Sequence, residues 1–340
     1  MRNKNVDMLR GLLILMIMFY HYTFRFSEIY GYKTIEFWSL KDWGTIGVGC
    51  FFIISGYFLI PKKGFKNINL SWLKQKFLRL FPLYFITITI TFLITNLLGL
   101  PGKEVSFFEY LLNIPFINGI INTPYVDGAH WYLTYLIIFY ILFYLMSCLV
   151  KFKKNLNADK MLLMLLLINL VFKFLNISFI YKLLGGDYLV FILIGIFIKK
   201  DLQGKLFYLH IFLFLLLVYF NFGMVVCGFI IAFILMFSFI INIKEDLTRN
   251  NPLYFVGEIS YPIYLLHQNL GYVLLFNFMK LNNAYKHYLI ILVIVFIVII
   301  FISKWLSLIY EKLGFRFSYS LERKKLYDKT YFKKNRENKR

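Results

Sequence analysis

Charged residues are scarce in this sequence: Asp, Glu, Lys and Arg together make up 16% of its 340 residues, whereas hydrophobic residues make up 60%. A soluble domain of this length could not remove so much apolar surface from water, so the composition predicts an integral membrane protein. Cysteine is also rare, with only Cys50, Cys148 and Cys227. These three have neither metal-ligand spacing nor a disulfide framework, so we interpret them as small apolar side chains and predict no metal site.

Alanine is absent before Ala129, so no small-x-small cleavage site follows the apolar stretch near the N-terminus. We therefore interpret this stretch as a first transmembrane helix rather than as a signal peptide. The sequence also has no internal repeat, which argues against a transporter because many transporters are built from repeats.

The net charge of +21 is unevenly distributed. With a cytoplasmic N-terminus, the predicted inner segments hold 28 Lys and Arg and the predicted outer loops hold 6. Cytoplasmic loops of membrane proteins collect basic residues in this way, so we expect both termini in the cytoplasm and no nucleic-acid partner.

The hydrophobic runs predict an all-α integral membrane fold with about ten transmembrane helices, since about 20 apolar residues cross a bilayer. We expect a transmembrane domain over 1–315 and a basic cytoplasmic tail over 316–340, which would lie on anionic lipid. The segment 107–122, broken by Pro115, is predicted to be interfacial or re-entrant, and Asn221 to Gly223 is predicted to be a tight turn. The predicted spans are 8–26, 44–61, 78–98, 130–149, 161–180, 186–198, 206–221, 224–243, 254–278 and 288–309.

Three ionisable residues in the first span, "DMLRGLLILMIMFYHYTFRF" (7–26), are not explained by lipid contact. Arg10 and His21 are 11 residues apart, which is three helical turns with about 20° of drift, so both lie on one face. Asp7, one turn before Arg10, can pair with it. An apolar environment keeps a histidine neutral and available as a base, which favours a catalytic His21 over a purely structural one.

Several motifs along the chain resemble one known family. The spacing of Arg10 and His21 matches the R-x10-H signature of the integral-membrane acyltransferase family 3. The resemblance continues in "GVGCFFIISGYFL" (47–59), "KFLRLFPLYF" (76–85), "HWYLTYLIIFYIL" (130–142) and "ISYPIYLLH" (259–267). These segments occur in the family's order and span most of the chain.

The chain departs from the family pattern in two places. Where relatives commonly have Arg-x-x-Arg before the third helix, this chain has Lys76 and Arg79, and lysine cannot form the bidentate fork that arginine offers to phosphate. The last helix reaches Glu311 followed by Lys-Leu-Gly rather than a proline motif, and no role is transferred to Glu311.

The resemblance implies O-acyl transfer, usually acetyl transfer, from cytoplasmic acyl-CoA to a hydroxyl of an envelope carbohydrate or lipid-linked sugar. It implies a multi-pass protein of the bacterial cytoplasmic (inner) membrane, in contact with lipids, with acetyl-CoA as a substrate and no bound cofactor. The competing interpretation is a transporter or flippase of a lipid-linked sugar or small solute. Buried charges in a bundle of ten helices are compatible with this function too.

The ionisable residues at membrane depth and the family resemblance together give the candidate residues. We expect His21 to act as general base with Arg10 beside it, and Arg79 and Lys76 to meet the donor's phosphates. His267 is either a structural hydrogen-bonding residue or part of the site, and His130 is predicted to be interfacial. The remaining candidates for substrate binding are Asp7 and Ser55. For Ser55, Gly56 and Tyr57, close helix packing is favoured over a backbone opening for the donor.

Overall fold

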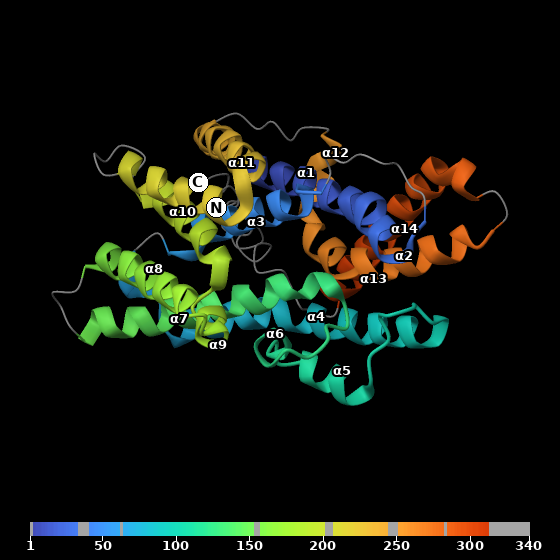
Figure 1. The fold of residues 1–340 in the computed structure, drawn as a ribbon, viewed down its shortest axis with the longest axis horizontal. Coiled ribbons are helices and arrows are strands. Elements are labelled where there is room, and N and C mark those ends of the chain that lie inside the picture. The colour runs from blue at the N-terminus through green and yellow to red at the C-terminus, as the bar shows by residue number, and fades with distance from the viewer. Residues whose placement is uncertain are drawn as a thin grey trace, which may run out of the picture.

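The computed structural model describes residues 3–32, 41–61, 64–152, 157–200, 207–243, 251–281 and 284–312. The predicted tail, 316–340, lies outside the described residues. All regular elements in the described part are helical, and they form an elongated bundle (Figure 1). They are α1 (Lys4–Tyr20), the π-helical turn η1 (His21–Arg25), α2 (Phe26–Tyr30), α3 (Trp43–Leu59), η3 (Phe65–Asn67), α4 (Leu70–Leu98), α5 (Phe107–Asn113), α6 (Asn118–Ile121), η4 (Gly128–His130), α7 (Trp131–Phe152), α8 (Ala158–Phe174), α9 (Ser178–Leu183), η5 (Gly186–Tyr188), α10 (Leu189–Lys200), α11 (Phe207–Asn242), α12 (Pro252–Glu258), α13 (Ser260–Met279), η6 (Ala284–His287) and α14 (Tyr288–Lys312).

Six helical stretches in the described residues are long and apolar enough to cross a membrane. The helix Trp43–Leu59 is also apolar but shorter than these six. The protein is therefore a multi-pass membrane protein. The six stretches are Lys4–Tyr30, Leu70–Leu98, Gly128–Phe152, Ser178–Lys199, Tyr208–Asn242 and Tyr288–Lys312.

Each span that the sequence predicts coincides with helix in the described residues, and two of the spans are interrupted. The break predicted over Asn221 to Gly223 is present at Gly223, whose φ of 88° divides α11 into two helical halves. The predicted span 161–180 is interrupted after α8, where Asn176 adopts a left-handed backbone. The predicted span 254–278 is interrupted at Ile259, because Pro262 has no N–H to donate to the carbonyl of residue 258.

The segment 107–122 forms two short helices, α5 and α6, on one side of the bundle (Figure 1). A capping box between Ser106 and Glu109 begins α5. Phe116, with φ of 62°, follows Pro115 and separates α5 from α6. The break that Pro115 predicts is therefore present.

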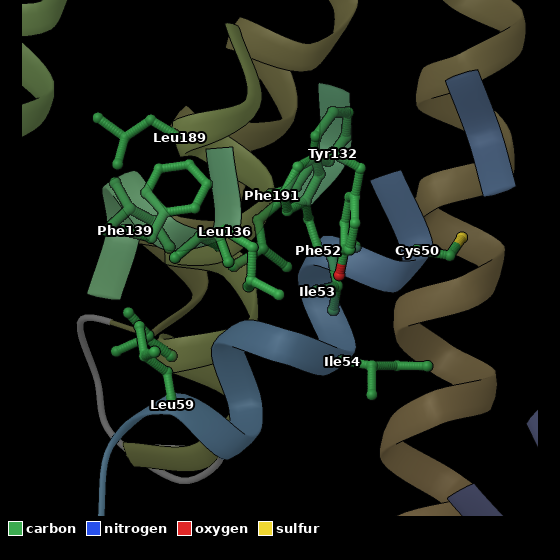
Figure 2. Packing of buried hydrophobic residues seen from close by; sticks show 14 of the residues in the cluster. Cys50, Phe52, Ile53, Ile54, Leu59, Tyr132, Leu136, Phe139, Leu189 and Phe191 are labelled. Carbon is green, nitrogen blue, oxygen red and sulfur yellow. The ribbon is translucent and has the colours of Figure 1, made fainter. Parts of the chain in front are cut away.

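The main apolar core lies between α3, α7 and α10. Figure 2 shows Phe52 and Ile53 of α3 facing Leu136 and Phe139 of α7, with Phe191 of α10 beside them. A second core of buried residues joins the first helices to α13 and α14. Together the two cores fix α1, the helix that carries Arg10 and His21, against the rest of the bundle.

Helices α1 and α12 approach so closely that only glycine fits between them. A Cβ atom added to Gly257 would lie 1.7 Å from the carbonyl oxygen of Asp7, and one added to Gly11 would lie 2.0 Å from that of Leu253. Small residues permit this backbone contact in membrane helices. The contact fixes the depth and rotation of α1, and with them the positions of Asp7 and Arg10.

Candidate functional site

His21 lies where α1 changes from an α-helix to the single π-helical turn η1. Such turns inside helices are frequent at functional sites. The Nδ1 atom of His21 is 3.0 Å from the hydroxyl oxygen of Tyr272 on α13. The ring of His21 packs edge-on against that of His267, with centroids 5.0 Å apart.

His267 is fully buried and has a fixed tautomer. Its Nδ1 lies 2.8 Å from the carbonyl oxygen of Tyr264, and because a carbonyl only accepts, Nδ1 must carry the hydrogen. The Nε2 atom then presents a lone pair, and within the described residues it has no hydrogen-bond partner. Leaving a buried polar atom unpaired costs about 1–3 kcal/mol, so this atom suits a ligand that supplies the missing donor.

His130 corrects one sequence-based prediction. It was expected at the membrane interface beside Trp131, but only 1% of it is exposed. Its Nε2 donates to the carbonyl of Leu265 at 3.1 Å, and its ring packs against Tyr84 with centroids 5.2 Å apart. The interfacial prediction was wrong because the His130 ring packs against α4 and α13, which removes it from contact with lipid.

Asp127 connects the loop before α7 to α13. Its carboxylate is fully buried and accepts hydrogen bonds from the backbone N–H groups of Ala129 and Asn269, each at 2.9 Å. The side chain of Asn269 returns the contact by donating to the carbonyl of Val126 at 2.7 Å. This reciprocal pair holds His130 and His267 at their positions on neighbouring elements.

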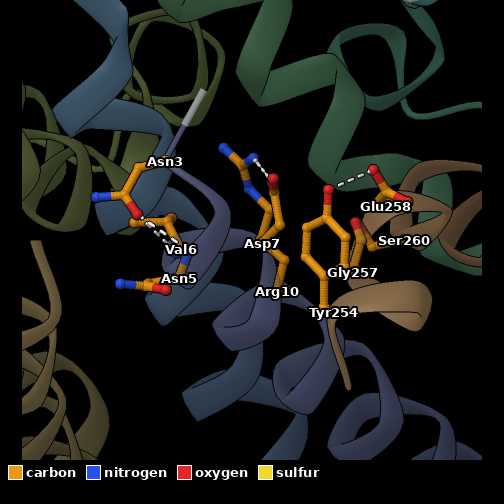
Figure 3. A network of polar contacts seen from close by, with 9 residues as sticks. All are labelled: Asn3, Asn5, Val6, Asp7, Arg10, Tyr254, Gly257, Glu258 and Ser260. Atoms are coloured by element: carbon orange, nitrogen blue, oxygen red, sulfur yellow. Dashed lines mark hydrogen bonds and ion pairs between the residues drawn. The ribbon is translucent and has the colours of Figure 1, made fainter. Parts of the chain in front are cut away.

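Arg10 lies three turns before His21, about 16 Å along the helix axis. It forms the predicted ion pair with Asp7, with Nη1 2.8 Å from Oδ1, and Asp7 itself is only 1% exposed (Figure 3). The guanidinium also lies 5.4 Å from the centre of the Phe58 ring. Arg10 is thus held by α1 and α3 together, in an orientation that both contacts restrict.

Arg10 belongs to a group of four cations from three helices. Lys76 lies over the rings of Trp72 and Tyr140, at 5.5 and 5.4 Å, and Arg10, Arg79 and Lys199 are all within electrostatic range of it. Lys199, near the end of α10, donates to the carbonyl of Ile60. Asp7 offsets the charge of Arg10, but the four basic side chains still leave an excess of positive charge, which a polyanion would neutralise. We call Arg10, Lys76, Arg79 and Lys199 the cationic cluster.

Ser55 lies on α3 and pairs with a tyrosine of α7. Its hydroxyl is 2.9 Å from that of Tyr132, whose ring in turn packs against Tyr264 at 5.5 Å. The neighbouring Gly56 serves close packing, because a Cβ atom there would lie 2.2 Å from the carbonyl oxygen of Ile192. The structure therefore gives Gly56 a packing role and gives Ser55 a tyrosine partner.

The opposite end of the site, beyond His21, also carries positive charge. Lys103, in the loop after α4, and Arg25 in η1 both lie within electrostatic range of His21. Burial, together with the nearby Arg25, lowers the pKa of Lys103 below its ordinary value. Arg25 forms an ion pair with Glu28, so the positive charge at this end is partly neutralised.

Comparison with known proteins identifies the family. A family model described as an acyltransferase domain matches residues 3–308. The chain belongs to acyltransferase family 3. No curated protein and no solved structure matches the chain. The resemblance found in the sequence motifs is thus confirmed, and the protein is a membrane acyltransferase.

The structure of this acyltransferase brings together some of the residues that the sequence selects and separates others. His21 and His267 are in contact, and Arg10 shares a cluster with Lys76 and Arg79. The two groups lie at different depths, so Asp7 contacts Arg10 and not the histidines. No group of three or more His, Cys, Asp or Glu side chains in the described part of the chain could hold a metal ion.

Sequence reasoning missed Tyr272, Asp127 and Asn269. One signal was available: His267 is followed by Gln268 and Asn269, three polar residues in succession within an apolar helix. Polar residues at membrane depth are functional candidates, so these three residues are candidates on the same grounds as His21. Tyr272 had no such signal, because tyrosine is abundant in this chain and only the fold shows which one faces a histidine.

Proposed function

We propose that this acyltransferase is an O-acetyltransferase that moves an acetyl group from cytoplasmic acetyl-CoA to a hydroxyl of an envelope carbohydrate or lipid-linked sugar. The observation that carries the proposal is the contact of His21 with Tyr272 and His267, at the end of a helix whose other end joins the cationic cluster. The proposed location is the bacterial inner membrane, with Arg10 toward the cytoplasm.

His21 acts as general base in this proposal. When its Nδ1–H donates to the hydroxyl oxygen of Tyr272, the Nε2 atom is unprotonated and can take the proton of the acceptor hydroxyl. The acceptor oxygen then attacks the thioester carbonyl carbon, and the C–S bond breaks as the tetrahedral intermediate collapses. The proton on His21 passes to the departing thiolate, which leaves as CoA thiol.

His267 binds the acceptor. Its Nε2 lone pair is buried and unpaired within the described residues, so it can accept a hydrogen bond from a sugar hydroxyl. Tyr22 supports this arrangement by donating to the carbonyl of His267 at 2.7 Å. Two adjacent rings, one removing a proton and one holding a neighbouring hydroxyl, would orient the reacting oxygen.

The cationic cluster binds the phosphates of the donor. CoA carries a diphosphate and a ribose phosphate, which require several positive charges, and Arg79 and Arg10 supply guanidinium groups suited to phosphate. The pantetheine arm is long enough to bridge a gap of about 16 Å along α1 and bring the thioester to His21. Asp7 would orient Arg10, and Ser55, held by Tyr132, would contribute a hydroxyl to substrate binding.

The test uses the purified full-length protein in lipid nanodiscs, with envelope glycan from a strain that lacks the protein as acceptor. We expect acetyl-CoA to be consumed with release of thiol, and His21→Ala to lose about 100-fold or more of the rate, as loss of a general base does. His287→Ala, an exposed histidine in η6, serves as the matched control. Transfer by His21→Ala at the wild-type rate would refute the base assignment. Glycan transport without thiol release would instead support the transporter interpretation.

A further inference from the structure

A cavity of about 600 Å³ lies between α6, α7 and α9, and the proposed chemistry does not use it. One side is formed by α6 and the loop that follows it, the floor by the first turns of α7, and the far side by α9 and η5. Its volume lies within the range of about 300–1,000 Å³ that is usual for small-molecule sites. The cavity is therefore large enough to hold a small molecule.

Half-buried aromatic rings form one wall of the cavity. Tyr188 lies between Trp131 and Tyr135, with ring centroids 4.6 and 5.1 Å away, and all three rings keep part of their surface exposed. The C–H faces of a pyranose ring pack well on exposed aromatic faces, because polarised C–H groups meet the negative face of the ring. The wall therefore suits a sugar ring better than a lipid tail, which would need a continuous apolar lining.

Polar groups form the rim. Lys182 donates to the side-chain oxygen of Asn122 at 2.7 Å, which leaves the ammonium further protons to donate. Lys182 is the one charged side chain among the residues that line the cavity in the described part of the chain. Nearby Asp187 is already paired with Lys173 at 2.5 Å and does not line the cavity. The cavity thus has a positive edge without an acidic side chain to balance it.

The cavity is linked to His267 through α7 and Tyr264, whose ring centroid lies 6.0 Å from that of His267. Trp131, in the aromatic wall, directly follows His130, whose ring packs against Tyr84 and lies near Tyr264. Tyr132, the next residue, contacts Tyr264 from the other side of α7. Two side-chain contacts, Tyr132 with Tyr264 and Tyr264 with His267, therefore connect the cavity wall to the proposed acceptor site.

We propose that this cavity binds a saccharide unit that carries an anionic substituent, with the sugar ring against Trp131, Tyr135 and Tyr188 and the anion at Lys182. The proposal rests on the proposed function in one respect, that the saccharide belongs to the acceptor. The acceptor would then be an acidic glycan, and the contact that recognises its charge would lie away from the reacting hydroxyl.

The test measures binding without any acyl donor. Trigalacturonate is the acidic probe and maltotriose the neutral one, each titrated by calorimetry into the full-length protein in phosphatidylcholine nanodiscs. Trigalacturonate should bind the wild type, and Lys182→Gln should weaken it about tenfold, because a charge-assisted hydrogen bond is lost. Lys286→Gln, an exposed lysine in η6, should leave the affinity unchanged.

Two further variants separate the cavity from the catalytic site. Ile120→Trp, which introduces a large side chain at the cavity wall, should abolish binding of the acidic probe without removing any charge. His21→Ala should bind trigalacturonate as the wild type does, so failure of the acyl-transfer proposal would leave this result intact.

Equal affinity for the wild type and Lys182→Gln, or maltotriose binding as tight as that of trigalacturonate, would overturn the recognition of an anion. Undiminished binding to Ile120→Trp would overturn the cavity as the site. Displacement of trigalacturonate by soluble glycerol phosphate in the phosphatidylcholine nanodiscs would show that a phospholipid headgroup can occupy the cavity, which also contradicts the proposal.

Discussion

Replacing Tyr272 with Phe tests how His21 is held ready for proton transfer. The substitution removes the hydroxyl 3.0 Å from His21 Nδ1 and keeps the ring, whose neighbours include Phe26 and Tyr30 at centroid distances of 5.7 and 5.8 Å. Packing is therefore retained while one hydrogen bond is lost. Without that acceptor, the imidazole is free to place its hydrogen on Nε2, where it cannot act as a base.

The size of the effect follows from the one lost bond. A neutral intramolecular hydrogen bond contributes about 0.5–1.5 kcal/mol. At about 1.36 kcal/mol per tenfold in rate, this corresponds to a fall in kcat/KM of about 2- to 13-fold. The measurement is thiol release from acetyl-CoA at saturating donor and varied acceptor glycan. Tyr110→Phe, which removes a tyrosine hydroxyl 2.8 Å from Thr89 Oγ1, should keep the wild-type rate.

A double-mutant cycle decides whether Tyr272 acts through His21. In a protein that already carries His21→Ala, adding Tyr272→Phe should cause no further loss, because there is no imidazole left to orient. A full additional loss in the double variant, or an unchanged rate in Tyr272→Phe alone, would refute the reasoning.

Three other predictions concern the donor site, the helix contact and the topology. Arg79→Gln should raise KM for acetyl-CoA about tenfold, since a charge-assisted contact to phosphate is lost, whereas Lys66→Gln in η3 should not. Equal KM values for the two variants would contradict donor binding by the cationic cluster. Gly257→Ala should lower the free energy of unfolding by about 1–3 kcal/mol, and with it the thermal unfolding midpoint, because its Cβ would lie 1.7 Å from the Asp7 carbonyl oxygen. Gly228→Ala, with nothing within 4 Å, should unfold at or slightly above the wild-type temperature, because alanine favours a helix more than glycine does. Identical midpoints for the two variants would argue against the α1–α12 contact. In a background in which the exposed Cys148 is replaced by Ser, a membrane-impermeant maleimide should label Glu104→Cys in intact cells and Lys66→Cys only after permeabilisation; the reverse pattern would invert the proposed orientation.

The sequence by itself determined the class of the protein and most of its helices. Hydrophobic runs long enough to span a bilayer are a local property, so their approximate positions follow without tertiary information. The same holds for Arg10 and His21, because the period of a single helix places them on one face. Pro115 and Asn221 to Gly223 likewise marked breaks that are governed by local backbone chemistry.

Only the tertiary structure decided which residues surround His21. Tyr272 lies 251 positions away along the chain, and Asp127 contacts the backbone of Asn269 across 142 positions. His130 was predicted from its aromatic neighbours in sequence to be interfacial, yet the packing of α7 against α13 buries it. In a membrane helix nearly every side chain is apolar, so the hydrophobic pattern does not show which face meets another helix. That choice depends on backbone approaches such as Gly257 against Asp7, which exist only once the helices are packed together.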